Sequence, residues 1–241
     1  IRMPYRACFK KLTKFIIIML WMIIPIHSYS EQVAISQHLY KLYKGEILFG
    51  KSSYSLYKKD NSFFFEIVSE TDGVFKLKKD ERVEFSNYVI NSGSISPLKY
   101  EYIRERKDKK DHIVTIFNGD SGVYTIDNGI KKEHHQVANI LDRLSVQIAY
   151  QEDLKNGTFE STYTVLDKGR LRKYIYTIHS DDVIDTVFGE TNTIVIKRVI
   201  ENNKRSTLTW YAVDHDFIPV KIEQYRKKSL KFTVYLDKIN K

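Results

Sequence analysis

Two short stretches of the sequence carry histidine and aspartate close enough together to suggest metal or acid-base chemistry. One is His134-His135 followed by Asp142, and the other is Asp214-His215-Asp216. A metal site needs its imidazole and carboxylate ligands to converge on one point. Adjacent histidines on a strand point to opposite faces, and neither stretch has the i, i+4 pair of a helical zinc site. We therefore interpret both as turn or loop residues and expect neither a metal nor a cofactor.

Nucleophilic and carboxylate chemistry find equally little support in the sequence. Ser145 lies in a helical pattern without the glycines of a nucleophile elbow. The carboxylate pairs Asp181-Asp182 and Glu152-Asp153 occupy turn-like or outward positions, which is typical of a hydrated surface. No glycine-rich phosphate loop occurs. The sequence predicts no catalytic residue and favours a protein that is not an enzyme.

Aromatic residues are the more informative signal, since the chain has 17 Tyr and 13 Phe and many lie in strand-like segments. They could simply fill a core. Alternatively, a subset could line a cavity for an acyl chain or another apolar ligand, as curved sheets of this size can do. The residues that we predict for such a lining are Tyr163, Tyr174, Tyr176, Trp210, Phe232, Leu144 and Ile148.

One amphipathic helix is predicted over residues 136–157, where apolar side chains recur mostly every three or four positions. Its start is ambiguous between Asn139 and Asp142, either of which could cap it, and Asn156-Gly157 supplies a left-handed stop. A single helix of this kind in a β protein usually covers one face or one open end of a sheet.

The remainder, from about residue 32 to the end, alternates like strands that turn every eight to twelve residues. We count about 11 to 13 strands. In one of the last strands Leu208, Trp210 and Ala212 share one face, opposite Thr207, Thr209 and Tyr211. The predicted fold is mainly β: a single curved antiparallel sheet or partial barrel with the amphipathic helix packed on its open face.

The first 30 residues read as a secretory signal peptide. Five basic residues and no acidic one precede the apolar run Phe15–Ile26, and Ser28 and Ser30 suit a cut before Glu31. An uncleaved anchor is the alternative. Because the chain opens on Ile1, either Met3 is the start or the sequence is truncated. We expect periplasmic export, with residues 31–241 as a single domain that has no membrane span once the leader is removed.

Charge and cysteine content narrow the functional classes further. The chain carries +9, but without the leader's five basic residues the excess falls to +4, and these cations are scattered. No basic stripe or reading motif accompanies them, so nucleic-acid binding is not expected. The only cysteine, Cys8, lies in the leader and before its apolar run, so neither a disulfide nor a lipid-attachment cysteine is expected.

Several segments resemble an exported bacterial family of unknown function. They are the run 92–97 with Tyr100, the segment from Asp142 to Gly157, Thr186–Gly189, and above all the closing pattern W-x-A-x-D-x-x-x-I-P-V-K-I from Trp210 to Ile222. The resemblance spans about residues 36–238 and supplies no catalytic residue. Arg143 stands where the family often has Pro. By analogy of layout alone, the fold is similar to the periplasmic half-barrels that carry lipoproteins under a helical lid.

Together these observations favour a periplasmic, non-enzymatic binding or carrier module for an apolar envelope component such as a lipid. The alternative is an envelope assembly protein with a solid core that binds a partner protein. An outer-membrane β-barrel is less favoured, because charged residues such as Lys99, Arg104 and Glu223 interrupt its strands. An enzyme is the remaining class.

Overall fold

The structure is a computed structural model, and it describes residues 33–77, 79–119, 122–134 and 139–240. The predicted signal peptide, residues 1–30, and His135 lie outside the described residues. Within the described residues, no helix combines the length and apolarity needed to cross a bilayer.

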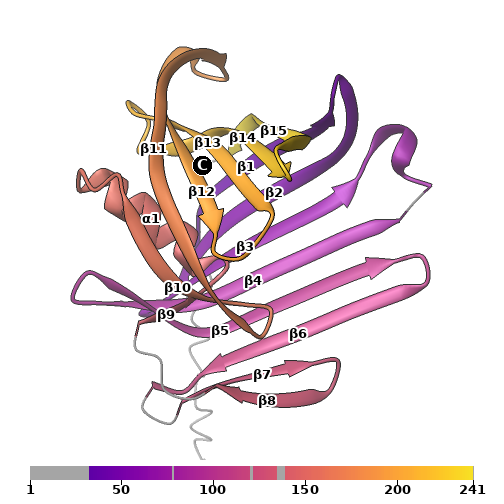
Figure 1. Cartoon of the computed structure of the whole chain (residues 1–241), viewed down its shortest axis with the longest axis vertical. Helices are drawn as coiled ribbons and strands as arrows, with labels where there is room; N and C mark the ends of the chain where they lie inside the picture. The colour runs from indigo at the N-terminus through magenta and orange to yellow at the C-terminus, as the bar shows by residue number, and fades with distance from the viewer. Residues whose placement is uncertain (1–32, 78, 120–121, 135–138, 241) are drawn as a thin grey trace, which may run out of the picture. The chain divides into compact units, whose positions relative to one another are not determined.

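The described residues form one sheet of fifteen strands with a single α-helix (Figure 1). The strands are β1 (Val33–Lys44), β2 (Ile47–Lys59), β3 (Ser62–Thr71), β4 (Asp80–Asn91), β5 (Ser94–Arg106), β6 (Lys109–Phe117), β7 (Val123–Asp127), β8 (Ile130–His134), β9 (Ile140–Asp142), β10 (Ser161–Asp167), β11 (Arg170–Thr186), β12 (Gly189–Ile200), β13 (Arg205–Ala212), β14 (Ile218–Arg226) and β15 (Ser229–Asn240). The helix α1 is Ser145–Lys155, and a 3-10 turn, η1 (Gly73–Phe75), joins β3 to β4.

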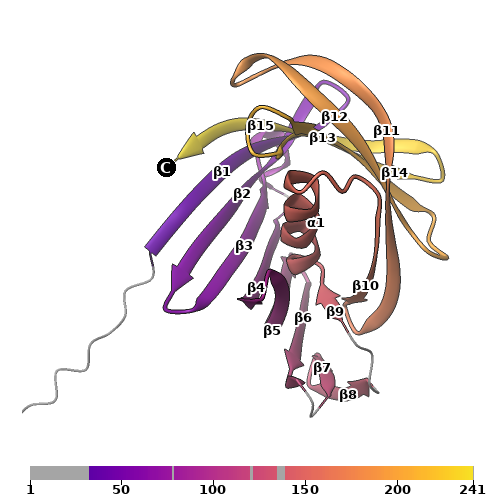
Figure 2. The ribbon, with the colours of Figure 1, turned by 90° about the vertical axis from the view of Figure 1, so that its left-hand side faces the viewer.

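The sheet has two arms that meet where β1 pairs with β15. The strand order is β8-β7-β6-β5-β4-β3-β2-β1-β15-β14-β13-β12-β11-β10-β9. We call β1–β8 the first arm and β9–β15 the second arm. Figure 2 shows the two arms curving toward each other with α1 between them. The predicted curved, mainly antiparallel sheet with one helix on its concave side is therefore confirmed.

Two of the fifteen strands were not expected from the sequence, and both lie at the edges of the sheet. β8 has four exposed residues out of five, so it lacks the alternation that marks a half-buried strand. β9 is three residues long and pairs in parallel with β10, the one parallel pairing between described strands. Ile140 and Leu141 belong to β9, so the prediction of a helix over this segment was wrong at its start.

The second arm buries side chains on both of its faces near the Trp210 hairpin. Trp210 is 7% exposed and packs with Val195, whereas its neighbour Tyr211, also 7% exposed, packs with the residues around α1. The pairing register of β13 against β14 shifts between Trp210 and Tyr211. The expected contrast of one apolar and one mixed face thus gives way here to a strand covered on both sides.

The turn between β10 and β11 closes the concave side by touching the first arm. Lys168 and Gly169 at this turn both have left-handed backbone angles, with φ of 50° and 72°. A Cβ at position 169 would stand 3.3 Å from Thr125 Cγ2 of β7. Glycine is suited to this position because it tolerates the positive φ and leaves room for the facing strand.

Candidate binding site around the helix

The segment that leads into α1 is anchored by the buried carboxylate of Asp142. Its Oδ1 accepts hydrogen bonds from the backbone N–H groups of Leu144 (2.7 Å) and Ser145 (3.0 Å). Its Oδ2 accepts one from the Ser86 hydroxyl of β4 (2.7 Å), and Ser145 Oγ accepts from the Asp142 N–H (2.8 Å). Asp142, Ser86 and Ser145 are all fully buried. Of the two predicted caps, Asp142 accepts from N–H groups at the helix start, although the N-cap position itself is Leu144, which has no side-chain cap.

Burial and hydrogen bonding act on Asp142 in opposite directions. Burial raises the pKa of its carboxyl group above the ordinary value, because an ion is poorly solvated there. The bonds from Ser145, Ser86 and Leu144 favour the ionised form and offset part of that rise. An ionised Asp142 that lacked the hydrogen bonds from Ser86, Leu144 and Ser145 would therefore destabilise the fold.

Arg143 joins the helix start to both arms. Its Nε lies 3.2 Å from Glu84 of β4, and its Nη1 donates to Asp167 at the end of β10 (3.3 Å). Tyr100 of β5 donates its hydroxyl proton to the same Glu84 carboxylate at 2.8 Å. Glu84 is only 4% exposed, so the guanidinium supplies the countercharge that this acid requires. Asp142 and Arg143 together fix the entry to α1 against β4 and β10.

Lys168 lies beside this ion-pair group, and no carboxylate oxygen of the described residues is within 4.0 Å of its amine. Its Nζ is 3.2 Å from the centroid of the Tyr102 ring, a cation–π arrangement that favours the charged amine. Burial and then the nearby Arg143 act in the opposite direction and lower the pKa of Lys168 to about 7. The amine is therefore placed to change charge near neutral pH.

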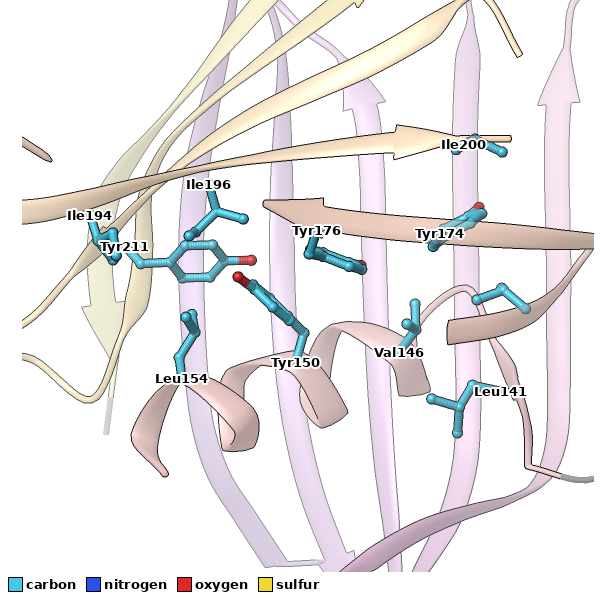
Figure 3. Close-up of a cluster of buried hydrophobic side chains, with 11 residues drawn as sticks. Leu141, Val146, Tyr150, Leu154, Tyr174, Tyr176, Ile194, Ile196, Ile200 and Tyr211 are labelled. Carbon is cyan, nitrogen blue, oxygen red and sulfur yellow. The ribbon is translucent and has the colours of Figure 1, made fainter. Parts of the chain in front are cut away.

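The body of α1 packs tightly against the second arm (Figure 3). The Tyr150 ring stacks on Tyr176 of β11, with centroids 4.0 Å apart, and meets Tyr211 of β13 edge-on at 5.9 Å. The Tyr150 hydroxyl donates to the carbonyl of Phe159 (2.7 Å). Asp153 accepts hydrogen bonds from Ser161 (2.6 Å) and from Tyr163 of β10.

The opposite side of α1 faces the first arm and is packed less completely. A cavity of about 70 Å³ lies between the helix and strands β1–β3, and Tyr211 of β13 and Pro219 of β14 close it on the side of the second arm. Its apolar wall includes Tyr54, Phe65 and Ile148, and Gln147 and Gln151 of the helix also line it. The full lining is Ser36, His38, Tyr40, Tyr54, Leu56, Phe65, Gln147, Ile148, Gln151, Tyr211 and Pro219. The space holds about two water molecules at liquid density and is well below the volume of about 300 Å³ at which ligand pockets begin.

The structure divides the seven predicted lining residues among three apolar clusters. The cluster between α1 and the second arm contains Tyr174 and Tyr176, with Tyr163 packed against it. The cluster in the first arm contains Leu144, with Ile148 packed against it. Trp210 and Phe232 belong to a third cluster, centred on β13–β15 and β1. Only Ile148 of the seven lines the cavity.

The histidine and serine candidates lie apart from one another. His134 bonds to Thr125 (3.1 Å), and burial lowers the pKa of its imidazole. His215 stacks on Phe188 with ring centroids 3.7 Å apart. No three His, Cys, Asp or Glu side chains within the described ranges are grouped as a metal ion would require. Ser145 is held by Asp142 and has no accessible surface.

Sequence reasoning missed most of the cavity wall and the lysine at the β10–β11 turn. Tyr40 and Tyr54 lie in the part of the sequence that alternates like strands, and this was the available signal. Their meeting with Tyr211 depends on the pairing of β1 with β15, which joins strands about 200 residues apart and leaves no local trace. Lys168 reads as an ordinary turn residue until its contact with Tyr102 is seen.

Comparison with known proteins gives a family and a broad likeness in structure. No curated protein sequence matches the chain. A crystal structure from Bacteroides fragilis NCTC 9343, described as a protein inferred to be exported with a YmcC-like fold, is 12% identical, with a TM-score of 0.35 over 86% of this chain and 95% of that one. A protein from Parabacteroides distasonis ATCC 8503, inferred to be a lipoprotein, is 15% identical, with a TM-score of 0.34 over 85% and 94%.

The family model covers most of the fold described above. It matches residues 39–235, a range that runs from β1 to β15 and includes α1, Asp142 and the whole cavity wall except Ser36 and His38. The chain therefore belongs to the family described as protein of unknown function DUF3108.

Proposed function

We propose that this protein is an exported, non-catalytic binding protein that holds an apolar or amphiphilic ligand between α1 and the first arm. Export is inferred from the basic and apolar leader in residues 1–30. A non-catalytic role is supported by Ser145, whose hydroxyl is buried and accepts a hydrogen bond from the backbone N–H of Asp142. The ligand class follows from the aromatic wall of the cavity.

The observation that carries the proposal is the unequal attachment of α1 to the two arms. Helix side chains bond to the second-arm side through Tyr150, Asp153 and Gln151, the last of which donates to the Asp216 carbonyl (2.8 Å). No hydrogen bond found among the described residues joins the side chains of 146–155 to the first arm. Beyond its start, which Asp142 and Arg143 hold to β4, the helix is thus hydrogen-bonded through its side chains to the side of the second arm alone among the described residues.

A modest separation of α1 from β1–β3 would turn the 70 Å³ cavity into a groove. Its floor would be Tyr40, Tyr54 and Phe65, which suits an acyl chain or a ring system. His38 and Gln151 would stand among the polar groups that line it and could bond a ligand's head. Such an opening breaks apolar contacts, and the ligand replaces them.

The first test is native mass spectrometry of residues 31–241 purified from the periplasm, before and after delipidation, with titration of cis-parinaric acid. We expect a reproducible mass excess of lipid size and saturable fluorescence. Ile148→Trp should fill the cavity and abolish the titration. Val183→Trp, at a residue 56% exposed on β11, should bind as the wild type does. A bare mass together with no saturable fluorescence would refute the carrier proposal.

One observation favours a second candidate, an assembly protein that binds a partner protein with its outer surface. All three clusters are closely packed, and the cavity beneath α1 has only about 70 Å³. Photo-crosslinking from exposed positions in cells should then recover one reproducible partner. If crosslinking recovers no reproducible partner and the mass spectrum shows bound lipid, the carrier proposal is favoured over the assembly protein.

A further inference from the structure

The second arm carries a basic groove that the proposed function does not use. It has a volume of about 340 Å³ and is lined by Arg172, Asn202, Asn203, Lys204, Arg205 and Arg226. None of its lining residues lines the cavity under α1. Four of the six are cations and none is an acid.

Backbone pairing brings these cations together from three hairpins. The N–H of Glu201 bonds to the carbonyl of Lys173, which places the β12–β13 turn beside β11 (2.9 Å). The N–H of Lys227 bonds to the carbonyl of Lys204, which joins the β12–β13 and β14–β15 turns (2.8 Å). The groove is therefore built by the fold of the sheet, and its walls do not depend on flexible side chains alone.

Two arginines face each other directly across the groove wall. Arg205 of β13 is the register partner of Arg226 of β14. Like charges at directly opposed positions of an antiparallel pair destabilise the sheet. Within the described ranges, none of Arg172, Lys204, Arg205 and Arg226 has a carboxylate oxygen within 4.0 Å.

This absence of partners contrasts with the arginines of the first arm. Arg104 is bidentate on Asp80, and Arg106 is paired with Asp111 at 2.7 Å. Arg172 Nε is buried without a hydrogen-bond partner, as are the Nε atoms of Arg82, Arg106 and Arg198. The groove differs from the first arm in that its four cations lack carboxylate partners among the described residues, and an anion would supply the missing negative charge.

We propose that this groove binds an oxyanion of the phosphate class. Arginine guanidinium groups present paired N–H donors that match the oxygens of such a group, and the Asn202 and Asn203 amides can add neutral donors. A multiply charged anion also offsets the repulsion between Arg205 and Arg226. The same chemistry could come from a phospholipid headgroup or from a free phosphate compound.

The test consists of two binding experiments at constant ionic strength. Inorganic phosphate is titrated by calorimetry, and vesicles containing phosphatidylglycerol are compared with phosphatidylcholine vesicles by co-sedimentation. The variant Arg205→Gln/Arg226→Gln should weaken binding by about tenfold or more, since each charge-assisted bond contributes roughly a factor of ten. The control Lys44→Gln/Lys107→Gln removes the same charge from two exposed positions elsewhere, the end of β1 and the β5–β6 turn, and should bind as the wild type does.

Stability without the anion gives an independent readout. The arginine double variant should melt no lower than the wild type, because it removes a like-charge pair. Phosphate should then raise the melting temperature of the wild type and not that of the variant. Saturation by phosphate alone identifies a free anion as the ligand, and saturation by anionic vesicles identifies a headgroup. Equal loss in both double variants, or no saturation in either experiment, would overturn the proposal.

Discussion

Replacing Asp142 tests whether the helix start is held by the buried carboxylate. In Asp142→Ala the Ser86 hydroxyl and the N–H groups of Leu144 and Ser145 lose their acceptor. All four residues are buried, so water cannot readily take the place of the carboxylate. The fold should therefore be weakened at the point where the two arms and the helix meet.

The magnitude follows from the groups left unpaired. A buried donor without an acceptor costs about 1–3 kcal/mol, and the loss of a helix cap costs about 1 kcal/mol. Because the raised pKa of Asp142 shows that ionisation itself is unfavourable here, part of this is recovered, and we expect a net loss of about 3 kcal/mol. With a urea slope of about 2 kcal/mol per molar, the unfolding midpoint should fall by about 1.5 M.

Urea unfolding of three variants at several pH values checks this reasoning. Asp142→Asn keeps an oxygen for the two N–H groups and should lose about 1 kcal/mol or less. The native pKa of Asp142 lies above its unfolded value, so wild-type stability relative to Asp142→Asn should fall as the pH rises from about 3.8 through the native pKa. Asp185→Ala, at an exposed residue, should change stability by less than about 0.5 kcal/mol. If Asp142→Ala lowers the free energy of unfolding no more than Asp185→Ala does, the Asp142 carboxylate does not stabilise the helix start.

Two further predictions concern the β10–β11 turn. Lys168 has a native pKa of about 7 against about 10.4 in the unfolded chain, so the free-energy cost of burying its charge is complete below about pH 7 and fades as the pH rises toward 10. The unfolding free energy of the wild type minus that of Lys168→Met should therefore rise over this range. A difference that does not change with pH would contradict the shifted pKa. Gly169→Ala should cost more than Gly93→Ala in thermal melts, by about 1 kcal/mol, because both have left-handed φ but only position 169 faces Thr125. Equal losses of stability in the two variants would mean that the β10–β11 turn is not in close contact with Thr125 of β7.

Local pattern was sufficient for most of the strands and for the end of the helix. Tyr174 and Tyr176 alternate in the sequence and are both buried in β11, and Gly157 ends α1 with a φ of 77°. The start of the helix was misjudged because the apolar Ile140 and Leu141 continue the helical spacing by chance. They pair with β10 instead, as part of the edge strand β9, and no local period encodes this pairing.

The candidate site was harder to predict because distant elements build it. Trp210 and Tyr211 face opposite sides of β13, as the alternation of a strand predicts, but the sequence could not show that an apolar cluster would cover each side. The polar anchor was equally hidden, since Ser86 and Asp142 are 56 positions apart and each looks unremarkable alone.

The polar anchor and the cavity together restrict how a ligand could enter. Asp142 and Arg143 fix the segment before α1 to Ser86 and Glu84 of β4, so the start of the helix cannot leave the first arm without breaking buried hydrogen bonds and an ion pair. Farther along, the helix meets β1–β3 across the cavity. Opening should therefore pivot about the helix start, with the separation growing toward Gln151. A ligand bound in this way would lie along α1 with its apolar end near Ile148, and filling that position should block it while leaving the anchor intact.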